Sequence, residues 1–199
     1  PVSSDASQPS PSSQSSQAPA AGEDELLFQE SAPDGSTQAS VSLHVPGDPG
    51  AEASLRVCLQ GTDLGGKAFQ RETELSGMQF CQASYSPSGH YFIVDGVESG
   101  GEYHALYGWE VLPSGSTSYC LTGKLENACY YCASIQPKLK EAHGTWRDIH
   151  FSFVRWHEEE DRMLMEYAGT APDGSPFGGS FWFDLETLAA IPAQSSDPD

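Results

Sequence analysis

The sequence predicts an all-β protein built mainly from antiparallel meanders, with one short helical insert near residues 126–135. Runs in which apolar and polar residues alternate recur along the chain, and this is the pattern of strands with one buried face. Clusters of Pro, Gly, Ser and Asp separate the runs and have the composition of tight turns. Between the strand-rich middle and end of the chain, one stretch, Lys124 to Glu141, lacks strand character.

Composition divides the chain into three parts. Residues 1–22 contain one Val and otherwise only Ser, Gln, Pro, Ala, Asp and Gly, which cannot bury a hydrophobic core. We therefore expect residues 1–22 to be a disordered Ser/Pro/Gln linker. Residues 23–192 are predicted to form a single β-rich domain, and residues 193–199 a disordered acidic tail.

The first strands of the domain are short. Leu26–Phe28, Ala39–Val45 and Leu55–Gln60 have strand character, the last two with strict alternation. The turn sequence Ala-Pro-Asp-Gly-Ser occurs at Ala32–Ser36 and again at Ala171–Ser175. This recurrence indicates either an internal repeat of a hairpin or a coincidence of turn chemistry, because Pro-Asp-Gly is a common turn sequence.

The middle and the end of the chain have the same organisation. Strand-like runs lie at Phe80–Ser84, Tyr91–Val94, Tyr103–Leu112 and Thr117–Thr122. Three further runs within Trp146–Leu188 are joined by an acidic turn and by a Pro-Asp-Gly turn, which predicts a self-contained antiparallel meander.

Two of these segments resemble the blades of a β-propeller of the TolB or tryptophan-aspartate-repeat type. Tyr85–Gly96 (YSPSGHYFIVDG) is similar to the hairpin of such a blade, and Phe181–Leu188 (FWFDLETL) is similar to its terminal strand. A closed propeller needs at least four blades, on the order of 160 residues. Because only two units are recognisable, the sequence predicts either a propeller-like fragment or a β-sandwich or barrel.

The helical insert is predicted over Glu126–Ile135, before Pro137 stops it. Cys129 and Cys132 would then lie one turn apart on the same face of the helix. Three interpretations are open: a zinc site, a redox dithiol and structural cysteines. The zinc site would be formed by Cys120, Cys129, Cys132 and His143. A redox dithiol would require a thioredoxin-like βαβ context, which the surrounding strands do not supply.

The structural interpretation treats all five cysteines as disulfide candidates. In an exported chain Cys120 would pair with Cys129 or Cys132, and Cys58 with Cys81. Because the count is odd, at least one thiol would be free or intermolecular.

The chain is strongly acidic, with a formal net charge of −19. Nucleic acid binds through basic patches, so this surface excludes it as an expected partner, and anionic membranes are excluded for the same reason. A basic protein, a cation or an uncharged ligand is left open. The charge also keeps a secreted protein soluble, and we expect a monomer.

Localisation is predicted from the linker. Residues 1–22 resemble the spacer that follows the lipidated cysteine in surface lipoproteins of Gram-positive bacteria, although the cysteine itself is absent. The resemblance implies a domain tethered outside the cell, with a lipid anchor upstream of residue 1. The alternative is a secreted eukaryotic protein with an O-glycosylated Ser-rich stalk. No run approaches the ~20 apolar residues of a membrane-spanning helix.

Neither a catalytic motif nor a cofactor motif is recognisable in the sequence, and no cofactor is expected. Recognition by aromatic side chains is the remaining possibility. Trp109, Trp156 and Trp182 lie in or at the end of strands and either pack in the core or form an exposed shelf that stacks on sugars or anchors a protein.

Two functions follow as hypotheses. The first is a non-catalytic, envelope-tethered extracellular domain that binds a protein or glycan of the envelope or of a host. The alternative is a secreted hydrolase that acts on glycan or another envelope polymer with an unrecognised pair of carboxylates, whose separation would be a property of the tertiary structure.

Overall fold

The computed structural model describes residues 24–48, 50–62, 65–98, 104–112, 115–132, 135, 149–170 and 173–193. Within these residues the chain forms twelve strands and one short helix. All strand pairs are antiparallel, and the strands are divided equally among three sheets that do not close into a barrel. The predicted all-β class of antiparallel meanders with one helical insert is therefore confirmed.

Each sheet is a four-stranded meander in which consecutive strands are neighbours. Sheet A consists of β1 (Asp24–Ser31), β2 (Thr37–His44), β3 (Ser54–Thr62) and β4 (Ala68–Ser76). Sheet B consists of β5 (Met78–Tyr85), β6 (Tyr91–Glu98), β7 (His104–Leu112) and β8 (Gly115–Cys120). Sheet C consists of β9 (His150–Trp156), β10 (Arg162–Thr170), β11 (Pro176–Asp184) and β12 (Ala189–Pro192). The sequence indicated two blade-like units, whereas the structure has three.

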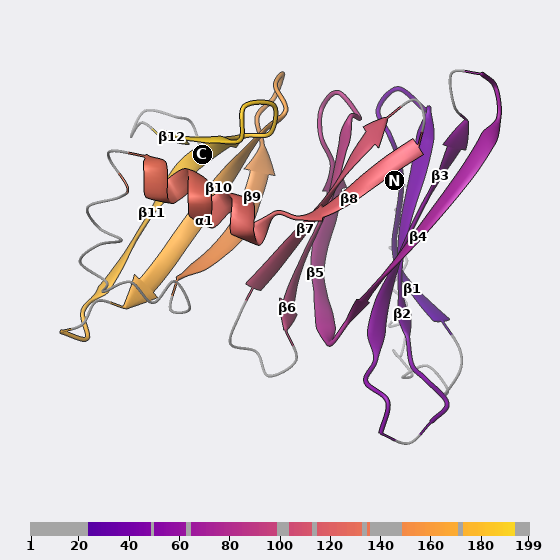
Figure 1. The fold of residues 1–199 in the computed structure, drawn as a ribbon, viewed down its shortest axis with the longest axis horizontal. Coiled ribbons are helices and arrows are strands. Elements are labelled where there is room, and N and C mark those ends of the chain that lie inside the picture. The colour runs from indigo at the N-terminus through magenta and orange to yellow at the C-terminus, as the bar shows by residue number, and fades with distance from the viewer. Residues whose placement is uncertain are drawn as a thin grey trace, which may run out of the picture.

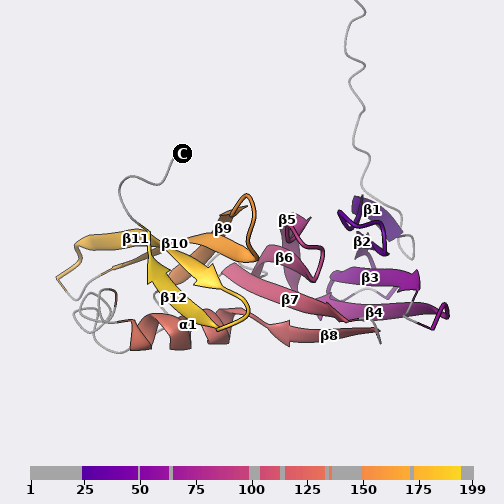
Figure 2. The ribbon, with the colours of Figure 1, turned by 90° about the horizontal axis from the view of Figure 1, so that it is seen from above.

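The three sheets form an open stack. Sheet B lies between the other two, and sheets A and C lie at opposite ends of the molecule in both views (Figures 1 and 2). Sheet B is therefore covered by a sheet on both faces. Sheets A and C each have one outer face that no other sheet covers.

The same connection joins the first two strands of every sheet. The amide of Ala32 donates to the carbonyl of Thr37, that of Ser86 to Tyr91, and that of His157 to Arg162, each at 2.8 Å. The first two turns also share a glycine with positive φ, 71° at Gly35 and 78° at Gly89, a backbone conformation that other residues rarely adopt. The three sheets are thus structurally equivalent from their first hairpin.

The recurrence of Ala-Pro-Asp-Gly-Ser is a coincidence of turn chemistry. Its first copy joins β1 to β2, the first two strands of sheet A, whereas its second copy joins β10 to β11, the middle strands of sheet C. In both copies the aspartate accepts a hydrogen bond from the amide of the serine two residues later, Asp34 from Ser36 and Asp173 from Ser175, each at 2.9 Å. The structural counterpart of the first copy is the turn Ser86–Gly89.

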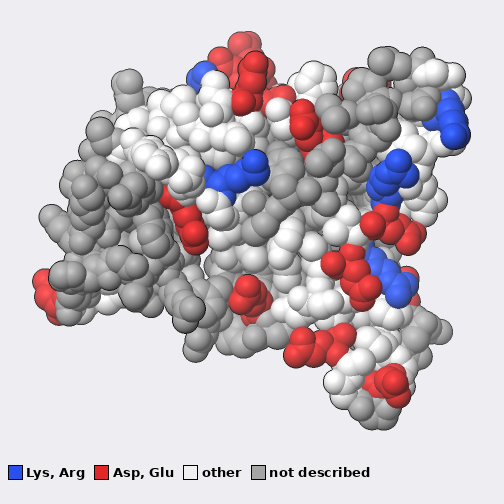
Figure 3. All heavy atoms as spheres, viewed as in Figure 1, with Lys and Arg blue, Asp and Glu red and all other residues white. Residues whose placement is uncertain are grey.

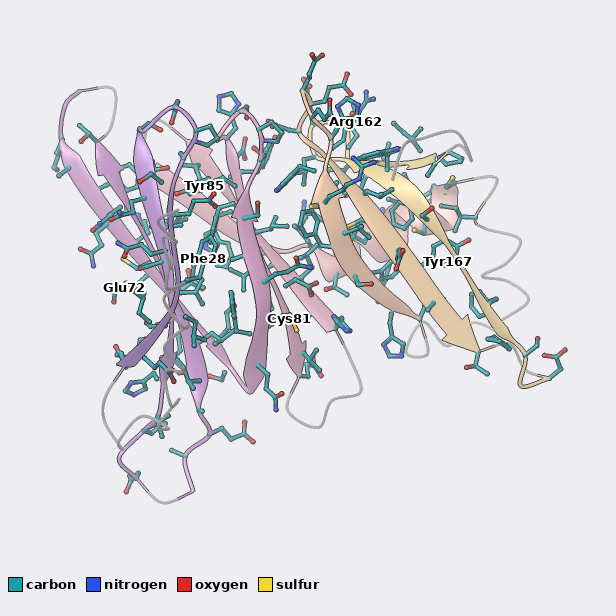
Figure 4. The ribbon with its side chains drawn as sticks, turned by 180° about the vertical axis from the view of Figure 1, so that it is seen from behind. Phe28, Glu72, Cys81, Tyr85, Arg162 and Tyr167 are labelled. Carbon is teal, nitrogen blue, oxygen red and sulfur yellow. The ribbon has the colours of Figure 1, made fainter. Side chains whose placement is uncertain are left out.

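One hydrophobic cluster fills the space between sheets A and B. Its centre is Phe92, whose ring centroid lies 5.0 Å from Tyr85, 5.9 Å from Trp109 and 6.0 Å from Phe28. Figure 4 shows Phe28 and Tyr85 in this layer. Apolar side chains of β2 and β3, such as Val57, close the cluster from the side of sheet A.

A second hydrophobic cluster fills the space between sheets B and C. Sheet B contributes Ile93 and Leu106, and sheet C contributes aromatic and methionine side chains such as Phe181 and Met165. The apolar run in β6 therefore serves two cores, since Phe92 faces sheet A and Ile93 faces sheet C. This explains why the run is continuous rather than alternating.

Helix α1 (Thr122–Tyr131) packs against the second cluster through Leu125, Ala128 and Cys129. Figure 2 shows α1 continuing from β8 and lying along sheet C. The helix begins four residues before the predicted start because Leu121 and Leu125, both fully buried, anchor its first turn, and the amide of Leu125 donates to the carbonyl of Leu121.

No helix among the described residues is long and apolar enough to cross a membrane. The predicted linker of residues 1–22 and residues 194–199 of the predicted tail lie outside the described residues. The prediction of one domain over residues 23–192 stays a prediction.

Candidate functional site

The three tryptophans predicted to form a shelf lie in different environments. Trp109 is 2% exposed in the cluster between sheets A and B, where its indole nitrogen donates to Thr73 Oγ1 at 3.3 Å. Trp182 lies on the outer face of sheet C but is 9% exposed, because Arg155 covers its ring at 5.2 Å. Trp109 and Trp182 are therefore buried rather than part of an exposed shelf.

Trp156 faces sheet B because of a bulge in β9. Simple alternation placed it opposite Phe151, but the register with β10 shifts between Leu164 and Met165 and leaves Val154 as an extra residue. Trp156 consequently shares the inner face with its partner Met163, and its indole nitrogen donates to Ser84 Oγ at 3.0 Å. The half-buried indole joins two sheets.

Cys58, Cys81 and Cys129 are free thiols. Cys58 lies on the outer face of sheet A, whereas Cys81 lies on β5 of sheet B, where Figure 4 labels it. The disulfide expected between them is not present, since strand register directs Cys58 away from sheet B. The side chain of Cys120 and the whole of His143 lie outside the described residues, so the predicted pairing of Cys120 and the zinc site stay predictions.

Cys129 and Cys132 are poorly placed for thiol chemistry. Burial, together with the nearby Cys132 and Glu126, raises the pKa of the Cys129 thiol to about 12. The pair also lies at the C-terminal end of α1, where the helix dipole disfavours a thiolate, whereas reactive cysteines sit at helix N-termini. Among the described residues, no group of three or more His, Cys, Asp or Glu has a geometry that could hold a metal ion.

A polar hollow of about 630 Å³ lies at one end of sheet A. We call it the glutamine groove. It is lined by the end of β1, the β1–β2 turn, the start of β2, the end of β3 and the start of β4. Its lining residues are Ser31, Gly35, Ser36, Thr37, Gln38, Gln60, Gly61, Thr62, Ala68, Phe69 and Gln70.

Strand register brings three amides together in this groove. Gln60 on β3 lies directly opposite Gln38 on β2 and Gln70 on β4, so the three side chains form a row across the outer face. The Gln60 Nε2 donates to Gln38 Oε1 at 2.6 Å, and Gln70 Nε2 donates to Glu72 Oε1 at 2.9 Å. The row is held in place and still offers unused donor and acceptor positions to a ligand, because each amide has two N–H donors and a carbonyl oxygen.

A glycine shapes the floor of the groove. A Cβ atom at Gly61 would lie 2.7 Å from the carbonyl oxygen of Ser36 and 2.8 Å from Thr37 Cγ2, which is closer than atoms approach without displacement. The missing side chain lets the β1–β2 turn approach β3. The row of glutamines and the turn hydroxyls therefore border one hollow.

None of the described residues that line the glutamine groove carries an ionisable side chain. This is unusual for a chain with a net charge of −19. Over sheet A, on the right of Figure 3, basic side chains are interspersed with the acidic ones. The groove thus offers amide and hydroxyl groups, which suit an uncharged ligand with many hydroxyl groups.

A second hollow lies where β7 meets sheet C and has a different chemistry. It has a volume of about 600 Å³ and is lined by His104, His150, Ser152, Glu166, Tyr167, Ala168, Gly179 and Ser180. Glu166 is the only carboxylate among these residues, and the glutamine groove has none. Neither set of lining residues contains the facing pair of carboxylates that the hydrolase hypothesis requires.

Comparison of the chain with protein-family models, with curated proteins and with solved structures gave no match.

Proposed function

We propose that this protein is a non-catalytic binding domain that acts outside the cell and recognises a neutral glycan in the glutamine groove. The observation that carries the proposal is the row of Gln38, Gln60 and Gln70 in a hollow with no ionisable lining residue. An amide can both donate hydrogen bonds to sugar hydroxyls and accept them. An uncharged ligand does not need a charged partner for favourable binding in the groove.

Electrostatics supports an uncharged ligand rather than an anionic one. The net charge of −19 repels acidic polysaccharides at long range, and the described lining of the groove contains no Lys or Arg with which to hold them. A neutral glycan is not repelled. In this proposal residues 1–22 are the tether that holds the domain away from the envelope, with a lipid anchor upstream, and the domain acts as a monomer.

Binding of the purified chain to immobilised neutral and acidic polysaccharides tests the proposal. We expect saturable binding to at least one neutral polysaccharide and none to acidic ones. Replacing both Gln38 and Gln60 by Ala should weaken that binding about tenfold, because each lost hydrogen bond contributes roughly 0.5–1.5 kcal/mol.

The matched control is Gln79→Ala, which removes an exposed glutamine from β5, outside the groove. We expect it to leave binding unchanged. Both variants should keep the melting temperature of the parent, since Gln38, Gln60 and Gln79 are on the outer surface. Absence of binding to every neutral polysaccharide, or equal binding by Q38A/Q60A and the parent, would contradict the proposal.

A further inference from the structure

The second hollow, where β7 meets sheet C, contains a histidine whose orientation is fixed by a buried carboxylate. Asp95 on β6 is 1% exposed and is the only acidic or basic residue among the buried residues that the structure describes. Its Oδ2 lies 3.4 Å from both the amide nitrogen of Phe153 and Gln82 Nε2, and its Oδ1 lies 3.4 Å from Nδ1 of His104. The carboxylate thus links sheet B to sheet C and reaches the imidazole.

This contact determines which nitrogen of His104 carries the proton. A carboxylate only accepts hydrogen bonds, so the imidazole nitrogen beside it, Nδ1, must be the donor. In the neutral ring the other nitrogen, Nε2, then has a free lone pair. The His104 side chain is about one third exposed and lines the hollow, so Nε2 of the neutral ring is available as an acceptor there.

The remaining lining groups are also rich in acceptors. Glu166 contributes a carboxylate from β10, and the hydroxyls of Ser152 and Ser180 lie opposite it on β9 and β11. None of the described lining residues is a Lys or an Arg. Gly179 leaves room for the ring of Tyr167, since a Cβ atom there would lie 2.9 Å from the hydroxyl of Tyr167, which Figure 4 labels on sheet C.

We propose that this hollow binds a small primary ammonium compound. An ammonium group is positively charged and has three N–H donors, which matches a lone pair, a carboxylate and hydroxyl oxygens. The net charge of −19 raises the local concentration of such cations. A coordinated metal fits less well, because the described residues contain no metal-binding group of three ligands. The site shares no residue with the glutamine groove, so either assignment can fail alone.

Titration of the ¹⁵N-labelled chain with ethanolamine, followed by amide chemical shifts, tests the proposal. At constant ionic strength we expect saturable shifts confined to β7, β9, β10 and β11, and none with ethylene glycol, which has the same size but no charge. Glu166→Gln should weaken binding about tenfold or more, because hydrogen bonds to charged groups contribute about 1.5–3 kcal/mol.

Glu158→Gln is the matched control, since it removes the same charge from the exposed turn between β9 and β10. We expect it to change the affinity by less than about twofold. Shifts spread over the acidic surface, or equal weakening by E166Q and E158Q, would overturn the proposal and indicate a diffuse cation atmosphere.

Asp95 acts as a positioning residue, and Asp95→Asn tests that role. The amide can donate to Nδ1, which would move the proton to Nε2 and replace the acceptor in the hollow by a donor. We expect the imidazole ¹⁵N shifts of His104 to report the Nε2–H form, and ethanolamine binding to weaken. If the parent chain already has the Nε2–H form, the proposal is wrong, whatever the stability of the variant.

Discussion

Phe92→Ala is the substitution that tests the stacked arrangement of the sheets most directly. Phe92 is fully buried between sheets A and B and contacts three aromatic rings at centroid distances of 5.0–6.0 Å. Removing a buried phenylalanine ring typically costs about 3–5 kcal/mol, from lost burial and from the cavity that remains. With three aromatic neighbours we expect about 4 kcal/mol. For a domain of this size that loss lowers the melting temperature by about 8–16 °C.

Phe181→Ala is the matched substitution in the other core. Phe181 is also fully buried, between sheets B and C, with its ring centroid 6.2 Å from Phe151 and 6.0 Å from Tyr167. Because sheet B contributes to both cores, we expect each substitution to shift one common unfolding transition. Differential scanning calorimetry and far-ultraviolet circular dichroism measure the transition in both variants.

Two results would refute this reasoning. A loss below about 1 kcal/mol for F92A would mean that the ring is not packed as described. Two separate calorimetric transitions, with F92A moving one and F181A the other, would mean that sheets A and C unfold independently. The single domain predicted over residues 23–192 would then have to be divided.

The other predictions concern individual ionisable groups. Cys81 is exposed and Cys129 is fully buried with a thiol pKa of about 12, so iodoacetamide should alkylate Cys81 first and Cys129 last. A mass-spectrometric time course measures the order, and early modification of Cys129 would contradict its burial. Burial also raises the pKa of Tyr85 to about 12, against a lowering contribution from its hydrogen bond with Thr37. Because the folded-state pKa of Tyr85 lies above the unfolded value of about 10, its stabilising contribution is complete below pH 10 and is lost as the pH rises towards 12. In an ultraviolet titration, Tyr85→Phe should remove one late-ionising phenol, and an unchanged number of late phenols would exclude this assignment.

Local patterns in the sequence predicted ten of the twelve strands, because these strands have one or two buried faces, but they did not predict β4 or β12. Alternation in β2, β3 and β10 corresponds to inner and outer faces in the structure. The apolar run in β6 has no alternation because Phe92 and Ile93 enter different cores. Turn chemistry predicted the hairpins, since Gly35 and Gly89 have the positive φ that their turns require.

The candidate sites could not be predicted in the same way. One extra residue, Val154, reverses the face on which Trp156 lies, and nothing in the local sequence indicates that bulge. Gln38 and Gln60 are 22 residues apart in the chain, and they become neighbours of each other and of Gln70 only through strand register. Asp95 and His104 were unremarkable in the sequence, and their significance depends on contact between sheets.

The sequence by itself determined that the chain forms antiparallel β-structure with one helical insert, because strand periodicity and turn chemistry act over a few residues. It also determined the strong negative charge, which is a sum over residues and needs no fold. The tertiary structure alone decided that there are three equivalent sheets in an open stack, with sheet B covered on both faces. It also decided which polar groups share a hollow, because register and sheet packing bring together side chains that are far apart along the chain.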